Sequence, residues 1–397
     1  MLEVAKKVAL TRPAVRTDAD LSGSTPPLGK PTMATIRDVA RAAAVSTATV
    51  SRVLNGTARV SDETRRRVSE AAKRLDYWPN GSARSLIHSR TQTLGVLLPD
   101  IFGEFFSEVI RGIDKAVRDA GLQVLLSSSH SSAEGLLSAA KAMAGRVDGF
   151  ILMAPDLEAE SAVDRIRKRF PLVLLNPRTQ TPGTVSVSIA NYEGAFAAVS
   201  HLIRLGHKRI AIVAGPMGNA DSDERLRGYR AALVAHDIEP DERLVLTGAF
   251  TEVSGYEAGS RILRLRPAPT AVFAANDGMA IGLISRLSEG GVRVPDDVGV
   301  MGFDDIPTAR YLAPPLSTVR TDAYELGACA VSGLLDVLGA EGEVLDLRWV
   351  MPWDLVIRRS CGALHGPRGS LTTTTPETTS EPAQSRGPIL QREEESC

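Results

Sequence analysis

The chain has 397 residues, which is enough for two or three domains with a sizeable core. Its hydrophobic content of 43% and charged content of 23% are typical of globular proteins, and no apolar run reaches the roughly 18 to 20 residues of a membrane-spanning helix. The net charge of −1 gives no sign of a nucleic-acid partner for the chain as a whole. Residues 33–90, however, hold eleven Lys and Arg against five Asp and Glu, so this segment has a net charge of +6 and suits phosphate binding.

The cysteines and the N-terminal segment indicate a reducing compartment. Cys329, Cys361 and Cys397 lie far apart and have neither CxxC nor metal-ligand spacing, so we expect no disulfide framework and no metal site. Residues 1–32 are rich in Pro, Ser, Thr, Gly and charges, which predicts a disordered extension without a signal-peptide core. We therefore expect a cytoplasmic protein.

Residues 35–56 predict two short helices joined by a tight turn. Thr35 and Asp38 have the spacing of a capping box at the start of the first helix. The apolar positions of that helix form one buried stripe: Ile36, Val39, Ala40 and Ala43. Ser46 follows the turn and is a suitable N-cap for the second helix.

The second helix has a small polar face. Val50, Val53 and Leu54 can face inward. The opposite face then carries Thr47, Ala48, Ser51, Arg52 and Asn55. Such a face suits a helix that enters a major groove and contacts base edges and phosphates. The alternative is an ordinary helical hairpin.

A third helix and a linker follow. Ser61 predicts a capped helix start, and the inward stripe of that helix is Val68, Ala71, Ala72 and Leu75. Its arginine run, residues 65–67, is either a solvated face or a set of phosphate contacts. Residues 79–91 are predicted to form a hinge helix and linker, too short and too Gly-weakened to be stable alone. Leu86 in this linker either packs on a neighbouring domain or wedges into a minor groove.

From Thr93 the pattern changes to apolar runs that alternate with helical spacing. The runs are residues 94–98, 123–126, 149–153, 172–175, 209–215, 270–275 and 298–302. Fully apolar strands alternating with helices predict parallel, doubly wound sheets covered on both faces. The stretch is too long for one such sheet, so we expect two linked lobes with polar loop residues, and a ligand, at the carboxyl ends of the strands. Residues 363–397 are rich in Thr, Ser, Pro and Glu and predict a disordered tail without leucine heptads.

From Met33 to about Cys361 the chain resembles the lactose-repressor (LacI/GalR) family of bacterial transcription regulators. The motifs that carry the resemblance are MATIRDVARAA, VSTATVSRVLNG, VSDETRRRV, DYWPNGSARSL, LGVLLPDI, GRVDGFIL, HLIRLGHKRIAIVAGP, RLRGYRAAL, SGYEAG, PTAVFAANDGMAIG and VRVPDDVGVMGFDDIPTARYLAPPLSTVR. Their number and order make the match specific.

The resemblance implies a small all-α helix-turn-helix head followed by an α/β core of two doubly wound lobes, of the periplasmic-binding-protein type. The implied segments are a head at 33–78, a hinge at 79–91 and a core at 92–362. In the core, the first lobe would comprise 92–190 with 319–347, and the second 191–318 with 348–362. The implied function is a homodimeric repressor of a pseudo-palindromic operator, controlled by a small molecule between the lobes, without a cofactor.

The resemblance also assigns residues. Thr47, Ala48 and Arg52 would read bases, Ser51 and Asn55 would contact phosphates with Thr49 as a third, and Leu86 would be the hinge leucine that bends the operator. The positions that line the effector cleft in relatives are Phe105, Phe106, Asn191, Asp221, Arg225, Phe250, Asn276 and Asp304. Their chemistry fits a sugar or sugar derivative, with a nucleoside or purine as the alternative, because it combines a guanidinium, a carboxylate and a flat aromatic face.

Some positions depart from the pattern of the family. Ala44 stands in the turn where glycine is common, and Asn176 and Ala190 stand where aspartate is frequent. We therefore expect a modified turn geometry and an altered mode of effector recognition. At the Asn276–Asp277 pair, we expect Asp277 to cap a helix and Asn276 to face the cleft.

Two other classes of protein fit the sequence less well. A sugar-binding protein of a transport system can share the two-lobed fold, but it needs a secretion signal and no basic head. An enzyme is disfavoured because the chain has no Walker A loop, no G-x-G-x-x-G opening a helix, no HExxH and no GxSxG.

Overall fold

The computed structural model describes residues 34–55, 60–78, 90–156, 159–340, 344–362 and 389–391. The chain divides into two compact units, with the boundary between residues 84 and 85. The predicted N-terminal extension at 1–32 and the hinge up to residue 89, with Leu86, lie outside the described residues.

The first unit contains three helices: α1 (Ile36–Ala42), α2 (Thr47–Asn55) and α3 (Asp62–Arg74). The predicted capping box is present, since the Thr35 backbone N–H donates to Asp38 Oδ2 at 3.0 Å and the Thr35 hydroxyl donates to the same oxygen at 2.7 Å. The predicted stripes meet in one small core. Its buried members are Val39, Ala40, Ala43, Val50, Val68 and Ala71.

A side chain of α3 stabilises the turn between α1 and α2. Ala44 has a φ of +51°, the left-handed conformation for which glycine is the usual residue. The Arg67 guanidinium donates to the carbonyls of Ala43 and Ala44, the latter at 3.3 Å. Arg67 is therefore committed to the fold of this unit, whereas Arg66 lies on the surface with a loose 4.0 Å ion pair to Glu70.

The first lobe of the second unit is built on a seven-stranded sheet with the order β13-β11-β5-β4-β3-β1-β2. Its strands are β1 (Thr93–Leu98), β2 (Gln123–Ser128), β3 (Gly149–Met153), β4 (Leu172–Leu175), β5 (Val185–Ile189), β11 (Arg348–Met351) and β13 (Ile389–Gln391). All pairs are parallel except β11 with β13. Its helices are α5 (Glu104–Asp119), α6 (Ala133–Met143), α7 (Glu160–Arg167) and α12 (Ala323–Gly339).

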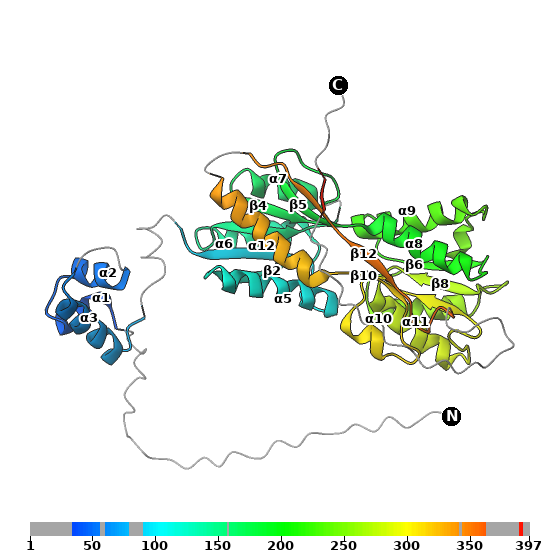
Figure 1. Cartoon of the computed structure of the whole chain (residues 1–397), viewed down its shortest axis with the longest axis horizontal. Coiled ribbons are helices and arrows are strands. Elements are labelled where there is room, and N and C mark those ends of the chain that lie inside the picture. The colour runs from blue at the N-terminus through cyan, green and yellow to red at the C-terminus, as the bar shows by residue number, and fades with distance from the viewer. Residues whose placement is uncertain are drawn as a thin grey trace, which may run out of the picture. The chain divides into compact units, whose positions relative to one another are not determined.

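Both faces of this sheet are covered, as the apolar strands predict. Leu94 and Val96 of β1 pack with Val109 of α5 and with α12, whereas Leu97 packs with Leu136 of α6 on the other face. In Figure 1, α12 crosses the first lobe beside α5. The alternation of side chains along β1 therefore explains why every residue of the apolar run 94–98 except Gly95 contributes to a core.

The second lobe repeats this plan on a parallel four-stranded sheet with the order β7-β6-β8-β9. Its elements are α8 (Asn191–Arg204), β6 (Ile210–Ala214), α9 (Ala220–Ala235), η2 (Glu242–Leu244), β7 (Val245–Thr247), α10 (Glu252–Ile262), β8 (Ala271–Ala274), α11 (Asp277–Glu289), β9 (Gly299–Met301) and η3 (Pro307–Tyr311). Helices α8 and α9 pack side by side, as do α10 and α11. The predicted fold class is confirmed.

The chain passes between the lobes three times. The first passage joins β5 to α8, and the other two run through β10 (Thr318–Thr321) and β12 (Trp353–Val356), which pair antiparallel. Figure 1 shows this ribbon between the two sheets. The two lobes are therefore joined by three neighbouring segments of the chain.

Two predicted boundaries are wrong. Residues 348–351 were assigned to the second lobe, but they form β11, which pairs with β5 in the sheet of the first lobe. Residues 389–391 fall in the predicted disordered tail, yet they form β13 against β11. Both strands are stabilised by backbone hydrogen bonds to strands far away in the sequence, which local composition does not reveal. Among the described residues, no helix is long and apolar enough to cross a membrane.

Candidate functional site

The first candidate surface is the outer face of α2. Thr47, Ala48 and Arg52 are exposed, while Val50 on the opposite side is completely buried. Local packing therefore orients the predicted base-reading residues toward solvent. The side chain of Asn55 lies outside the described residues.

Thr49 and Ser51, the two other predicted residues of α2 whose side chains are described, are only partly exposed. Ser46 caps the helix, because its Oγ accepts from the Thr49 backbone N–H at 3.1 Å. The hydroxyls of Ser46 and Thr49 lie 2.9 Å apart, so the Thr49 hydroxyl already has a partner at the helix start. Ser51 is half-buried on the edge of the outer face.

The second candidate site is a cavity of about 300 Å³ between the lobes of the second unit. Residues directly after β1, β3, β6, β8 and β9 line it, so the carboxyl ends of parallel strands from both lobes meet there, as predicted. Seven of the eight predicted effector residues line this cavity: Phe105, Phe106, Asp221, Arg225, Phe250, Asn276 and Asp304.

Arg225 is the centre of a buried polar network. Its Nε donates to Asn191 Oδ1 at 2.8 Å, and its Nη1 donates to the carbonyl of Ala275. Its Nη2 lies 3.2 Å from Asp304 Oδ1, and both side chains of this ion pair are nearly inaccessible. The network is closed by Asn191, whose Nδ2 donates to Asp221 Oδ1 at 2.8 Å. Asn191, the eighth predicted residue, thus lies behind the cavity and orients Arg225.

Burial dominates the acid–base properties of this network. It raises the pKa of Asp304 to about 7, although the Arg225 guanidinium works in the opposite direction. Burial likewise raises the pKa of Asp221, again opposed by Arg225. Burial thus raises the pKa of both carboxyl groups beside this guanidinium, that of Asp304 to about 7.

Strained backbone marks the same cavity. Phe250 has a φ of +59° and Asp304 a φ of +111°, conformations that residues with a Cβ rarely adopt. The Arg225 guanidinium lies 3.8 Å from the centroid of the Phe303 ring and 5.7 Å from that of Phe250. Strain of this kind collects where a fold holds side chains for a ligand rather than for its own packing.

The structure corrects one half of the prediction for the Asn276–Asp277 pair, because Asn276 and not Asp277 caps the helix. Asn276 is the N-cap of α11, since its Oδ1 accepts from the Met279 N–H at 2.9 Å while its Nδ2 donates to the Phe250 carbonyl at 2.9 Å. Asp277 is fully buried and accepts from the Ile306 N–H at 2.9 Å. A residue in the extended conformation just before the helix is the natural cap, and Asn276 occupies that position. Asn276 nevertheless lines the cavity as well.

Direct contacts between the lobes flank the cavity. On one side, Glu104 at the start of α5 accepts from the Thr308 N–H at 2.9 Å and from the Thr308 hydroxyl. On the other, Asn219 Nδ2 donates to Asp156 Oδ1 at 3.1 Å. The lobes are thus in a closed arrangement, and Glu104 and Asp156 are cavity residues that the sequence analysis missed. Their only sequence signal is position, because Asp156 follows a strand and Glu104 begins a helix.

A second cavity of about 350 Å³ also lies at the junction of the lobes and contains two of the unusual positions. Asn176 has a φ of +43°, and its Oδ1 accepts from the Ile189 N–H at 2.8 Å. Ala190 is nearly buried beside it and contributes only a methyl group. The two departures from aspartate therefore remove negative charge from the junction rather than from the effector cavity.

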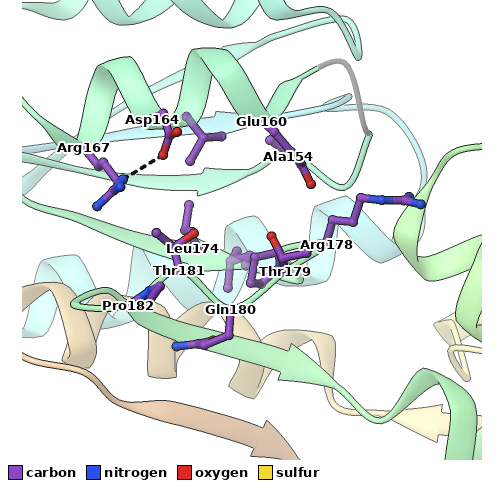
Figure 2. A pocket seen from close by; sticks show the side chains of 13 residues that line it. Ala154, Glu160, Asp164, Arg167, Leu174, Arg178, Thr179, Gln180, Thr181 and Pro182 are labelled. Atoms are coloured by element: carbon purple, nitrogen blue, oxygen red, sulfur yellow. Dashed lines mark hydrogen bonds and ion pairs between the residues drawn. The ribbon is translucent and has the colours of Figure 1, made fainter.

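A third cavity, of about 300 Å³, lies inside the first lobe between α7 and the loop after β4 (Figure 2). Arg167 Nε donates to Asp164 at 2.8 Å on one wall, and Gln180 accepts from Ser186 at 2.7 Å on the other. Arg178 extends away from the cavity, and its Nη1 donates to Asp223 at 3.0 Å. The interlobe cavity is the stronger candidate for an effector site, because seven of the eight predicted residues line it, whereas only Asn191 and Asp221 line the second cavity and none lines the third. In the described part of the chain, no group of His, Cys, Asp and Glu could hold a metal ion.

Comparisons with known proteins agree with this architecture. A family profile described as "Bacterial regulatory proteins, lacI family" matches residues 35–80, and one described as "Periplasmic binding protein-like domain" matches residues 199–361. The HTH-type transcriptional repressor CytR of Escherichia coli (strain K12) is 36% identical over 337 residues, which cover 84% of this chain and 98% of CytR. The repressor PurR of Edwardsiella ictaluri is 38% identical over 333 residues, with 83% and 97% covered.

Solved structures give the same result. The lac repressor dimer bound to operator and the anti-inducer ONPF superimposes with a TM-score of 0.75 at 30% identity, covering 83% of this chain and 99% of that one. A complex of the transcriptional regulator CelR with cellobiose has a TM-score of 0.62 at 33% identity, covering 82% and 99%. The chain therefore belongs to the lacI family of bacterial regulatory proteins and is a ligand-responsive transcriptional regulator.

Proposed function

We propose that the protein is a homodimeric repressor that binds a pseudo-palindromic operator and is controlled by a small molecule held between the core lobes. The observation that carries the proposal is the exposed outer face of α2, a small polar surface with one guanidinium on a helix whose other face is buried. A repressor acts on the chromosome, so we place the protein in the cytoplasm and assign it no catalytic step. A solute-binding role is disfavoured by the basic N-terminal unit.

On the DNA side, Thr47, Ala48 and Arg52 would contact base edges in the major groove. Ser51, Asn55 and Thr49 would contact phosphates near the helix start. We keep 33–78 as the DNA-binding unit and 79–91 as the hinge, with Leu86 as a wedge in the minor groove that bends the operator. The lac repressor dimer bound to operator supports this arrangement by analogy.

On the ligand side, the interlobe cavity would hold a sugar, a sugar derivative or a nucleoside. Binding there would change the balance between open and closed lobes, and the dimer would transmit this change to the hinges. The coupling has to be reciprocal, so operator DNA must change the affinity for the effector by the same factor as the effector changes the affinity for DNA.

This reciprocity gives the test. An operator is first selected from a random-sequence library, and a ligand is found by a thermal-shift screen of sugars and nucleosides. Tryptophan fluorescence then measures ligand affinity with and without saturating operator. We expect a difference of about 5- to 150-fold, the usual range of allosteric coupling. Equal affinities in the two titrations would exclude the allosteric function.

A further inference from the structure

The effector cavity is lined by far more acids than bases. Six carboxyl side chains line it: Asp100, Glu104, Asp156, Asp221, Glu252 and Asp304. Arg225 is the only Lys or Arg among the described residues that line it. An unbalanced set of this kind restricts the charge that a ligand can carry into the cavity.

Arg225 is not free to receive an anion. Each of its three nitrogens already faces a protein acceptor, namely Asn191 Oδ1, the Ala275 carbonyl and the Asp304 carboxylate. Its flat face lies over the Phe303 ring. A phosphate that bound Arg225 would have to break this buried network, which costs more than removing surface contacts.

Besides the hydroxyls of Ser131 and Thr251, the polar side chains that line the cavity are mostly acceptors. Asp304 Oδ1 is buried and has no hydrogen-bond partner, since Arg225 Nη2 approaches it at 3.2 Å without hydrogen-bond geometry. The Asn276 amide, which could otherwise donate, is used on the Phe250 carbonyl. A buried acceptor without a donor is costly, and a ligand hydroxyl that enters the cavity relieves that cost.

The shape of the cavity fits a ring. Phe105 and Phe250 line it from opposite lobes, and about 300 Å³ accommodates a compact cyclic molecule. Aromatic walls favour the flat face of a sugar or a base, while the carboxylates face its edge.

Building on the proposed function, we infer that the effector is an uncharged ring compound that donates hydroxyl groups, and that the cavity rejects its phosphorylated form. The shared chemistry is a hydroxylated ring, which a free sugar and the ribose of a nucleoside both provide. A phosphate brings up to two negative charges to a cavity lined by the acidic side chains of Asp100, Glu104, Asp156 and Glu252. Asp221 and Asp304 do not enter this count, because burial raises their pKa values. Like charges at close range in a partly desolvated site are strongly repelled.

The test uses the full chain and matched pairs of probes. The pairs are D-ribose with ribose 5-phosphate, D-glucose with glucose 6-phosphate, cytidine with cytidine monophosphate, and adenosine with adenosine monophosphate. Thermal shift ranks the compounds, and calorimetry measures the affinities of each pair in which one member binds. We expect a neutral member to bind and its phosphate to bind at least about tenfold more weakly, and the pair that binds identifies a free sugar or a nucleoside as the source.

A charge variant separates electrostatic rejection from steric exclusion. Glu252→Gln removes one negative charge from an exposed position at the mouth without changing volume. If charge causes the rejection, this variant reduces the difference in affinity between the neutral compound and its phosphate. Raising the salt concentration has the same effect. A difference in affinity that neither Glu252→Gln nor higher salt reduces would overturn the electrostatic explanation.

Two further results would overturn the inference. One is a phosphorylated compound that binds as tightly as its neutral partner, and the other is a panel in which no neutral compound raises the melting temperature. Operator binding is measured in parallel on the same preparation. A neutral compound that binds the core but leaves operator affinity unchanged would count against the proposed function while leaving the charge selectivity intact.

Discussion

Ala44 is a residue whose backbone conformation conflicts with its side chain. At a φ of +51° a Cβ atom costs roughly 1 to 2 kcal/mol, and Arg67 offsets part of this by bonding the carbonyls of the turn. We expect Ala44→Gly to stabilise the helix-turn-helix unit by about 0.5 to 1 kcal/mol, after the entropic cost of glycine is subtracted. Hydrogen exchange of residues 36–54 in the full chain, followed by mass spectrometry, measures the change.

Ala43→Gly is the matched control for that substitution. Ala43 is its immediate neighbour, but it has a φ of −91° and is buried in the small core. Glycine there should accelerate exchange, because it removes a buried methyl group and adds chain entropy. Faster exchange in both variants would show that the turn is not strained.

In the proposed DNA complex, Arg52 is the residue from which we expect most of the sequence specificity. Thr47 and Ala48 offer one hydroxyl and two methyl groups, so the guanidinium of Arg52 is the strongest base-reading group on the outer face. We expect Arg52→Ala to weaken binding to the selected operator by about 1 to 3 kcal/mol and to random DNA much less. Fluorescence anisotropy at fixed salt compares the two DNAs.

Arg41→Ala controls for the general effect of losing a positive charge. Arg41 is exposed on α1 and pairs loosely with Asp38 at 3.4 Å. Arg41→Ala should weaken binding to the selected operator and to random DNA to a similar, small extent. If Arg52→Ala also weakened both equally, Arg52 would be a phosphate contact only.

At the scale of elements, α5 and α12 approach each other through glycines. A Cβ on Gly327 would lie 2.2 Å from the Val109 carbonyl oxygen, and one on Gly112 would lie 1.9 Å from the Tyr324 carbonyl oxygen. Since backbone cannot move aside cheaply, we expect Gly327→Ala to reduce the free energy of unfolding by about 1 to 3 kcal/mol. Urea denaturation followed by circular dichroism measures it.

The same helix provides the control. Gly339 ends α12 and has no atom within 4 Å of the position of a Cβ. Gly339→Ala should therefore be neutral or stabilising by up to about 1 kcal/mol, through helix propensity alone. Equal losses in the two variants would contradict the close-packing explanation.

Strands could be predicted from the sequence where a continuous apolar run marked them. The seven apolar runs all form strands. For six of them the reason is burial on both faces, which needs apolar residues throughout, whereas β2 is a partly exposed edge strand. β5 was missed because its Val-Ser alternation resembles a half-exposed strand, whereas Ser186 is buried and satisfied by Gln180. β11 and β13 could not be predicted from local sequence, because β11 is stabilised by pairing with β5 and β13 by pairing with β11.

At the scale of the whole molecule, the buried carboxyl network makes stability depend on pH. The raised pKa of Asp304, about 7, means that the native state keeps a proton that the unfolded chain has already lost. Its stabilising effect is therefore complete at pH values below the unfolded pKa and disappears as the pH rises through about 7. The charged groups that influence it are Arg225 and Asp221 on α9 and Asp277 on α11.

The prediction compares the wild-type chain with Asp304→Asn, which cannot titrate. Between pH 5 and pH 8 the free energy of unfolding of the wild type should fall relative to that of the variant by on the order of 2 to 3 kcal/mol. Urea denaturation at several pH values measures the difference. Asp354→Asn, at an exposed position, serves as the control. Parallel pH curves for all three proteins would show that Asp304 titrates normally.

The sequence by itself determined the helix-turn-helix, the two-lobed fold class and the family, because caps, apolar periodicity and ordered motifs are local properties of the chain. Seven of the eight residues predicted from the sequence line the interlobe cavity. Only the tertiary structure decided how these residues share their hydrogen bonds. It placed Asn191 beside Arg225, made Asn276 rather than Asp277 the helix cap and brought Glu104 to Thr308 across the lobes. It also left Asp304 Oδ1 in an ion pair with Arg225 but without a hydrogen bond. These contacts join residues far apart in sequence, and their geometry depends on how two sheets meet.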